Sequence, residues 1–155
     1  MNPQGLDHAG IAARIPHSGS MCLLDSVLGW SAGEIRCRIV NHASLSHPLR
    51  TASGLLSPCA IEYAAQAMAV HGSLCSAADA RPRRGVLASA RSVRLHVPRL
   101  DDADGPLDVC AMLVASDRTQ ALYRFELRDA AGRMLVDGRA AVVLDLPLLP
   151  PGTSA

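Results

Sequence analysis

The chain has 155 residues and a mass of 16.3 kDa, with 49% hydrophobic and 19% charged residues. This length suits one domain that buries its own core, and the hydrophobic content excludes a disordered chain. The formal net charge of +1 gives no general attraction to nucleic acid, so we expect no nucleic-acid partner. No apolar run approaches the roughly 18 residues of a membrane helix, so we expect no membrane insertion.

All 15 basic residues are arginines. The absence of lysine excludes Schiff-base chemistry and the lysine of a phosphate-binding P-loop. The 5 cysteines include no Cys-x-x-Cys pair, so we expect no zinc site, no other metal and no cofactor. The start of the chain shows no signal peptide, and we therefore expect reduced cysteines in a cytoplasmic protein.

In chain order, we expect a flexible N-terminal lead-in over residues 1–14, one domain over 15–146 and a disordered tail over 147–155. Residues 21–30 fit a strand, or a short helix that leads into one. Alternating apolar and polar side chains predict half-buried strands further along. These strands are expected near residues 34–39, 92–97, 107–114, 123–128 and 134–144. Short turns between the later strands favour antiparallel hairpins.

Residues 57–70 predict the one convincing helix. Ser57 is a suitable N-cap, Pro58 suits the first turn, and small or apolar residues continue to Val70. Because this helix is apolar on nearly all sides, we expect it to be buried. The simplest architecture is an α+β hot-dog fold, in which a long antiparallel sheet wraps around the helix in the order β-β-α-β-β-β-β. Its open sheet edges predict a dimer.

Glu62 lies inside this predicted helix and is one of three glutamates in the chain. Its neighbours are small or apolar, and burying an ionised carboxylate without a partner favours the neutral form. The start of the helix favours the charged form by only about 0.3–1 kcal/mol. A carboxyl poised between the two forms suits general acid–base catalysis. The alternative is a surface glutamate that pairs with an arginine at a dimer contact.

Three segments carry a resemblance to a known family. Residues 61–67 (IEYAAQA) resemble the central-helix motif of the β-hydroxyacyl-acyl-carrier-protein dehydratases, and most closely the branch found with aryl polyene pigment synthesis. Residues 15–17 (IPH), followed by residues 21–25 (MCLLD), resemble the opening of that branch. Residues 85–91 (GVLASAR) fit the strand that follows the helix.

The resemblance implies that 3-hydroxyacyl thioesters, held on the phosphopantetheine arm of an acyl carrier protein, are dehydrated to trans-2-enoyl thioesters. In this family a histidine removes the α-proton and an acidic residue, here Glu62, protonates the departing hydroxyl across the dimer. Backbone N–H groups near Cys59 and Ala60 are expected to polarise the thioester carbonyl. Gln66, one turn after Glu62, is expected among the substrate-binding residues.

The identity of the histidine stays open at this stage. Common members of the family carry it in a Gly-His-Phe-Pro-Gly segment at a fixed distance before the acid. Here the same count falls on Pro48, with His47 one residue further away and no flanking glycines. The pigment branch instead retains the Pro-His pair that ends in His17. We favour His17, with His47 as the alternative; His42, His71 or no catalytic histidine also remain open.

Six arginines occur in one stretch without an intervening acid: Arg81, Arg83, Arg84, Arg91, Arg94 and Arg99. They predict either a solvated hairpin, neutralised by the aspartates that follow, or a docking patch for the acidic carrier protein. Two other functions fit the same fold: a hot-dog acyl thioesterase, or a non-catalytic acyl-binding partner subunit. We expect a homodimer, with a higher oligomer or a heterodimer with another hot-dog subunit as alternatives.

Overall fold

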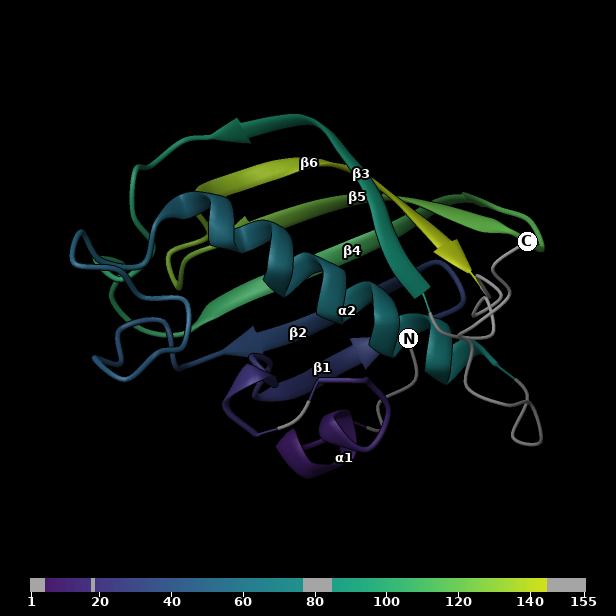
Figure 1. Cartoon of the computed structure of the whole chain (residues 1–155), viewed down its shortest axis with the longest axis horizontal. Helices are drawn as coiled ribbons and strands as arrows, with labels where there is room; N and C mark the ends of the chain where they lie inside the picture. The colour runs from purple at the N-terminus through teal and green to yellow at the C-terminus, as the bar shows by residue number, and fades with distance from the viewer. Residues whose placement is uncertain (1–4, 18, 77–84, 145–155) are drawn as a thin grey trace, which may run out of the picture.

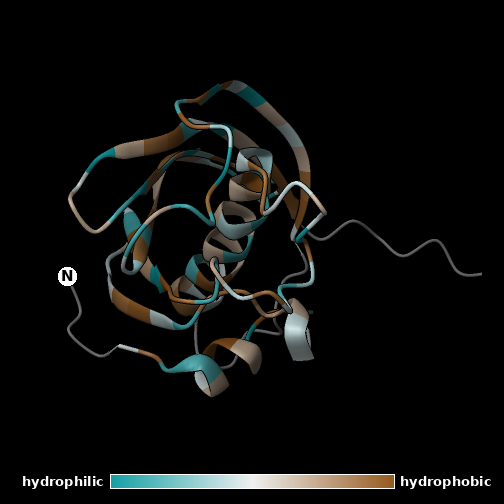
Figure 2. Cartoon of the chain, turned by 90° about the vertical axis from the view of Figure 1, so that its left-hand side faces the viewer, coloured by the Kyte–Doolittle hydropathy of each residue, from teal (hydrophilic) through white to brown (hydrophobic). Residues whose placement is uncertain are grey.

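The computed structural model describes residues 5–17, 19–76 and 85–144. Within these ranges six strands form one antiparallel sheet in the order β1-β2-β4-β5-β6-β3. The strands are β1 (Ser26–Trp30), β2 (Glu34–Ile39), β3 (Gly85–Leu95), β4 (Leu107–Ser116), β5 (Gln120–Arg128) and β6 (Met134–Leu144). The long helix α2 (Ala60–Cys75) crosses one face of the sheet (Figure 1), and the strands curve around it (Figure 2). The predicted hot-dog fold and its element order are confirmed.

Side-chain alternation explains which face of the sheet packs on α2. Along β5, Tyr123 and Phe125 are buried, whereas Leu122 before them and Arg124 between them are exposed. Successive residues of a strand point to opposite faces, so the buried set forms the core and the exposed set forms the outer face. Strand β3 lies at one edge of the sheet and is exposed over much of its length.

The helix begins differently from the prediction. Residues Ser57–Cys59 form a 3₁₀ turn, η2, that runs directly into α2. Ser57 is not the N-cap: Leu56 precedes the turn, with no side-chain cap, and the Ser57 N–H donates to the Pro98 carbonyl. Pro58 lies in the first turn as predicted, because this position needs no N–H donor.

The expectation that the helix is buried on all sides is also corrected. Tyr63 and Ala67 are fully buried against the sheet, whereas Glu62, Ala65 and Ala69 are only half-buried. The reason is that the sheet of one chain covers only part of the circumference of the helix. One stripe of α2 is therefore accessible in the single chain.

Before residue 15 the structure contains a short helix, α1 (His8–Ala12), whose first turn is capped by the Asp7 side chain. Ile11 is fully buried, and the Val27 N–H of β1 donates to the Leu6 carbonyl at 2.8 Å. The described part of the expected lead-in thus packs on the sheet. The expected tail lies outside the described residues, and the domain boundaries stay predictions.

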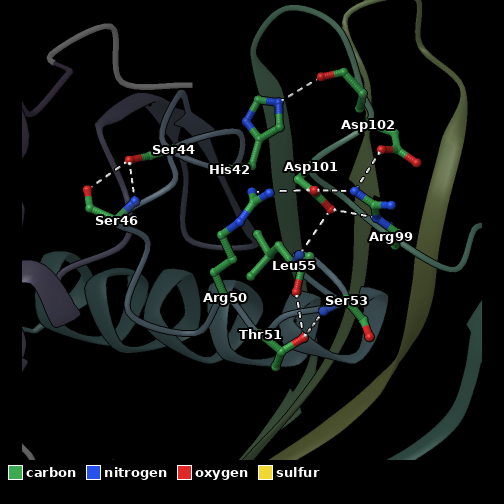
Figure 3. Close-up of polar contacts among 12 residues, drawn as sticks. His42, Ser44, Ser46, Arg50, Thr51, Ser53, Leu55, Arg99, Asp101 and Asp102 are labelled. Atoms are coloured by element: carbon green, nitrogen blue, oxygen red, sulfur yellow. Dashed lines mark hydrogen bonds and ion pairs between the residues drawn. The ribbon is translucent and has the colours of Figure 1, made fainter.

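A carboxylate fastens the segment before α2 to the segment after β3 (Figure 3). The Asp101 carboxylate accepts hydrogen bonds from the Leu55 N–H at 3.0 Å and from the Arg99 guanidinium at 3.1 and 2.6 Å. Arg50 adds an ion pair at 3.4 Å. The hydrogen bonds from Arg99 hold the pKa of Asp101 well below its usual range. This contact fixes where the helix begins.

Gly54 is required for this close approach. Its φ is +98°, and a Cβ there would lie 2.7 Å from both Arg99 Nε and Asp101 Oδ1. Gly54→Ala is therefore expected to lower the free energy of unfolding by about 1–3 kcal/mol, measured by urea denaturation. Gly33→Ala is the matched control, because nothing lies within 4 Å of its added Cβ, and a change within about 0.5 kcal/mol is expected. Equal losses in the two variants would contradict this account.

Candidate active site

Glu62 and His17 meet in the structure. The carboxylate oxygen Glu62 Oε1 lies 3.0 Å from His17 Nε2, with the two side chains 33% and 31% exposed. Gln66 Nε2 also donates to Glu62 Oε1, at 3.1 Å. The favoured histidine thus reaches the acid from the same chain, and both groups are open to solvent or to a ligand. The earlier expectation of a fully buried carboxyl is not met in the single chain.

Gln66 holds the segment that carries His17 against the helix. Its side chain is fully buried; Oε1 accepts from the Leu23 N–H at 2.9 Å, and Nε2 donates to the Met21 carbonyl at 2.7 Å. Ile15, buried to 7%, anchors the other end of the same segment. Gln66 was expected to bind substrate; the structure places it beneath the site, where it positions Glu62.

Glu62 Oε1 contacts two side chains. The Gln66 amide nitrogen can only donate, so Oε1 accepts from it, and the contact with His17 Nε2 is made with a hydrogen on either atom. His17 Nδ1 is buried and has no hydrogen-bond partner among the described residues. The arrangement places a carboxyl and an imidazole within hydrogen-bond distance, which is the geometry that general acid–base chemistry needs.

The pair lies at one end of a pocket of about 510 Å³. Its floor is one stripe of α2: Glu62, Ala65, Ala69 and Ser73. Residues at this spacing share a helix face, and at 1.5 Å per residue the stripe spans about 16 Å. The walls come from neighbouring segments, including Ile15, Gly85, Leu87 and Val142. This trough has apolar side chains along its middle and polar groups toward its ends, and its volume is that of small-molecule sites.

The far end of the trough is formed by a residue that the sequence analysis missed. Arg14 lines the pocket and donates to Ser73 Oγ at 3.3 Å. It falls in the segment expected to be flexible, so no pattern in the sequence pointed to it.

Cys59 and Ala60 were expected to offer free N–H groups to the thioester carbonyl. The Cys59 N–H donates to the Leu56 carbonyl at 3.0 Å, and the Ala60 N–H is also taken up within η2. The physical reason is the 3₁₀ turn, whose bonds to the residue three positions earlier use the N–H groups that an α-helical start leaves free. Neither residue lines the pocket, so neither supplies a free donor there.

His47 has a different environment from His17. It is buried to 6% and accepts the Leu49 N–H on Nδ1 at 3.1 Å, so Nε2 carries the hydrogen and donates to the Tyr63 hydroxyl at 2.8 Å. Tyr63 in turn donates to Asn41 at 3.0 Å. Both ring nitrogens are thus engaged within the chain, away from the Glu62 carboxylate.

His42 and His71 also have partners elsewhere. His42 Nε2 donates to the Ala103 carbonyl at 2.9 Å. His71 accepts from Tyr123 and donates to the Ser31 carbonyl, both at 2.8 Å. Across the described ranges, His17 is the histidine whose ring contacts Glu62.

Neither a metal centre nor a membrane span is found in the described part of the chain. No group of three or more His, Cys, Asp or Glu side chains there could hold a metal ion. None of its helices has both the length and the apolar character needed to cross a membrane.

Comparison with known proteins gives a family match and a set of similar structures. The family described as ApeP dehydratase, ApeP-like, matches residues 9–145. The dehydratase heterocomplex ApeI:P from Xenorhabdus doucetiae is similar, with 26% identity, a TM-score of 0.75, and coverage of 88% of this chain and 91% of that chain. Among curated protein sequences, none matches.

Thioesterases are also among the similar structures. HI1161 from Haemophilus influenzae has 12% identity and a TM-score of 0.66, covering 97% of this chain and 98% of that chain. A mutant of PA1618 from Pseudomonas aeruginosa has 16% identity and a TM-score of 0.66, covering 91% and 95%. At these identities the likeness shows the hot-dog fold alone.

The buried histidines predict a loss of stability in mild acid. Burial lowers the pKa of His47 and of His71, so the native state binds these protons more weakly than the unfolded state, whose histidine pKa is about 6.5. This stability is present above that pH and is lost as the pH falls below it. Urea denaturation is expected to give a smaller free energy of unfolding at pH 5.5 than at pH 7.5.

His47→Gln provides the comparison, because glutamine does not titrate. It is expected to be less stable than the parent at pH 7.5 but to lose less on acidification. An unchanged pH dependence in this variant would contradict the role given to His47. Asp101 does not contribute to the difference in stability between pH 7.5 and pH 5.5. Its lowered pKa affects stability only in stronger acid, at and below the usual aspartate range.

Proposed function

The chain belongs to the ApeP-like dehydratase family, and from this we propose that it removes water from 3-hydroxyacyl thioesters to give trans-2-enoyl thioesters. The observation that supports this most directly is the 3.0 Å contact between His17 Nε2 and Glu62 Oε1 at the wall of the pocket. An elimination of water needs one group that removes the α-proton and one that protonates the leaving hydroxyl. The pair supplies both from one chain.

We assign the base to His17 and the acid to Glu62. In the starting state Glu62 is protonated and the His17 ring carries its hydrogen on Nδ1, so His17 Nε2 has a free lone pair that takes the proton from the α-carbon. The C–O bond then breaks, and the hydroxyl leaves as water with the proton from Glu62. This leaves a protonated His17 beside a Glu62 carboxylate, and transfer across their contact restores the starting state. No electrons are exchanged with a cofactor.

The proposed substrate is presented on the phosphopantetheine arm of an acyl carrier protein, in fatty-acid-like or polyene pigment synthesis. The apolar trough supports an acyl group, because Ala65, Ala69 and Leu87 offer surface for a hydrocarbon chain and few polar partners. The remaining polar groups are concentrated at its two ends, with Glu62 at one end and Arg14 at the other.

We also propose that the working unit is a homodimer. Strand β3 has 11 residues and pairs with β6 on one side, so its other edge has open backbone groups in the single chain. Pairing with β3 of a second copy would extend the sheet and bring a second subunit over the open stripe of α2. A heterodimer with another hot-dog subunit is the alternative, and the similar ApeI:P protein is described as a heterocomplex.

The acid–base assignment is tested with Glu62→Gln and His17→Asn. Each variant keeps the shape of the side chain but removes its proton transfer, so kcat is expected to fall by about 10²–10⁴ with the fold intact by circular dichroism. The assay follows the ultraviolet absorbance of the conjugated enoyl thioester. His8→Asn is the matched control, because His8 lies outside the pocket, and it should retain activity.

Three results would contradict the proposal. Release of free thiol in place of an enoyl product would identify a thioesterase. Tight substrate binding without turnover by the parent protein would identify a non-catalytic partner subunit. Full activity in both site variants would place the chemistry elsewhere.

The trough predicts a dependence on acyl length. Ala69 lies on the floor about 10 Å along the helix from Glu62. Ala69→Phe is expected to lower kcat/KM at least about tenfold for a 3-hydroxydodecanoyl thioester, because the ring obstructs the path of the chain. A 3-hydroxybutanoyl thioester ends before this point and should be unaffected. Equal losses for both substrates would show that the acyl group takes another route.

A further inference from the structure

Three arginines stand side by side on the outer face of the sheet. Arg124 of β5 lies directly opposite Arg139 of β6, and Arg139 lies directly opposite Arg91 of β3. All three are exposed, and directly opposed residues have Cβ atoms only about 4.5–5.5 Å apart. We call these three residues the arginine row.

The described residues provide no carboxylate partner for this row. Like charges directly opposite each other destabilise a strand pair. Among the described residues, no carboxylate lies within 4.0 Å of a guanidinium of the row. Two residues further along, β5 carries Glu126 and β6 carries Asp137. These carboxylates already form ion pairs with other cationic side chains.

Glu126 and Asp137 each form ion pairs with side chains outside the row. Glu126 pairs with Arg128 at 3.2 Å. Asp137 pairs with Arg94 at 2.9 Å and with His96 at 3.1 Å. Within residues 5–17, 19–76 and 85–144, the positive charge of the row is therefore left without a partner.

Apolar side chains adjoin the row on its other side. The arginines line a hollow of about 520 Å³ together with Leu122 and Val114, which are 41% and 59% exposed. Arginine beside exposed aliphatic side chains is typical of a protein interface, in which apolar contacts accompany charge. A small inorganic anion would leave the apolar part uncovered.

We propose that the arginine row, with Leu122 and Val114, docks an acidic carrier-protein domain that delivers the thioester; this rests on the function proposed above. Two strand spacings make the row about 10 Å wide, which matches the width of one helix with its side chains. An acidic helix lying along the row would place carboxylates against all three guanidinium groups. The net charge of only +1 makes this attraction local to the row.

The row also lies close to the catalytic pocket. Strand β3 carries Arg91 of the row and, four residues earlier, Leu87 of the pocket wall, about 13 Å away along the strand. In the proposed dimer the edge of β3 is paired, so a flexible arm reaches the trough around the end of the strand at Gly85, which also lines the pocket. Docking on the row thus brings the thioester within reach of Glu62.

The docking site is tested with Arg139→Glu, at the centre of the row. The KM for a 3-hydroxyacyl group on an acyl carrier protein is expected to rise at least about tenfold, while the KM for the N-acetylcysteamine thioester stays within about twofold. Arg36→Glu is the matched control: it makes the same charge change on the outer face, in β2, outside the row. It should change neither KM. Arg139→Glu should not lower the unfolding midpoint, because it removes the repulsion between directly opposed arginines.

Binding of the holo carrier protein gives a readout that does not need turnover. In fluorescence titrations at low salt, the parent and Arg36→Glu are expected to bind equally and Arg139→Glu at least about tenfold more weakly, with a smaller salt dependence. Equal weakening by both variants, no binding by the parent, or equal effects on the carrier and the mimic would overturn the docking proposal. Turnover of the mimic without arginine-dependent carrier binding would leave the dehydratase function standing, whereas arginine-dependent binding without turnover would reject only that function.

Discussion

The buried amide of Gln66 is the contact on which the site depends. One side chain accepts from the Leu23 N–H, donates to the Met21 carbonyl and donates to Glu62. The first two bonds fix the segment that carries His17, and the third fixes the carboxylate that His17 meets. Because the amide is fully buried, each of these bonds is expensive to lose. Gln66 thus holds Glu62 and His17 against each other, although its own side chain is not open to the pocket.

The sequence was sufficient to predict the fold, and it pointed to the pair. Alternation in the strands and an apolar helix predict a sheet around a helix, because burial is decided by these periods. Glu62 stood out as a carboxylate among apolar residues, and the Pro-His motif pointed to His17. Which histidine contacts Glu62 does not follow from the sequence, because it depends on which ring nitrogens the rest of the chain already binds.

The start of α2 and the grouping of the arginines differ from the sequence-based expectations for local reasons. The N–H groups of Cys59 and Ala60 already donate within the chain because the helix starts as a 3₁₀ turn. Pro58 suits a 3₁₀ start and an α-helical start equally, so the sequence does not distinguish them. Of the arginines that are neighbours in sequence, Arg94 and Arg99 pair with aspartates, and Arg81, Arg83 and Arg84 lie outside the described residues. Strand register, which a single sequence does not reveal, brings Arg91 together with Arg124 and Arg139.

Strand β3 borders two surfaces that have no partner among the described residues, the trough and the arginine row. On its inner side Leu87 borders an apolar trough that one sheet leaves open, and on its outer side Arg91 joins a row of charge that one sheet leaves unpaired. An isolated chain gains nothing in stability from either feature, since exposed apolar surface and opposed like charges both cost free energy. Their placement on the two faces of one edge strand therefore supports the proposal that an acyl group binds on one side and an acidic carrier domain on the other.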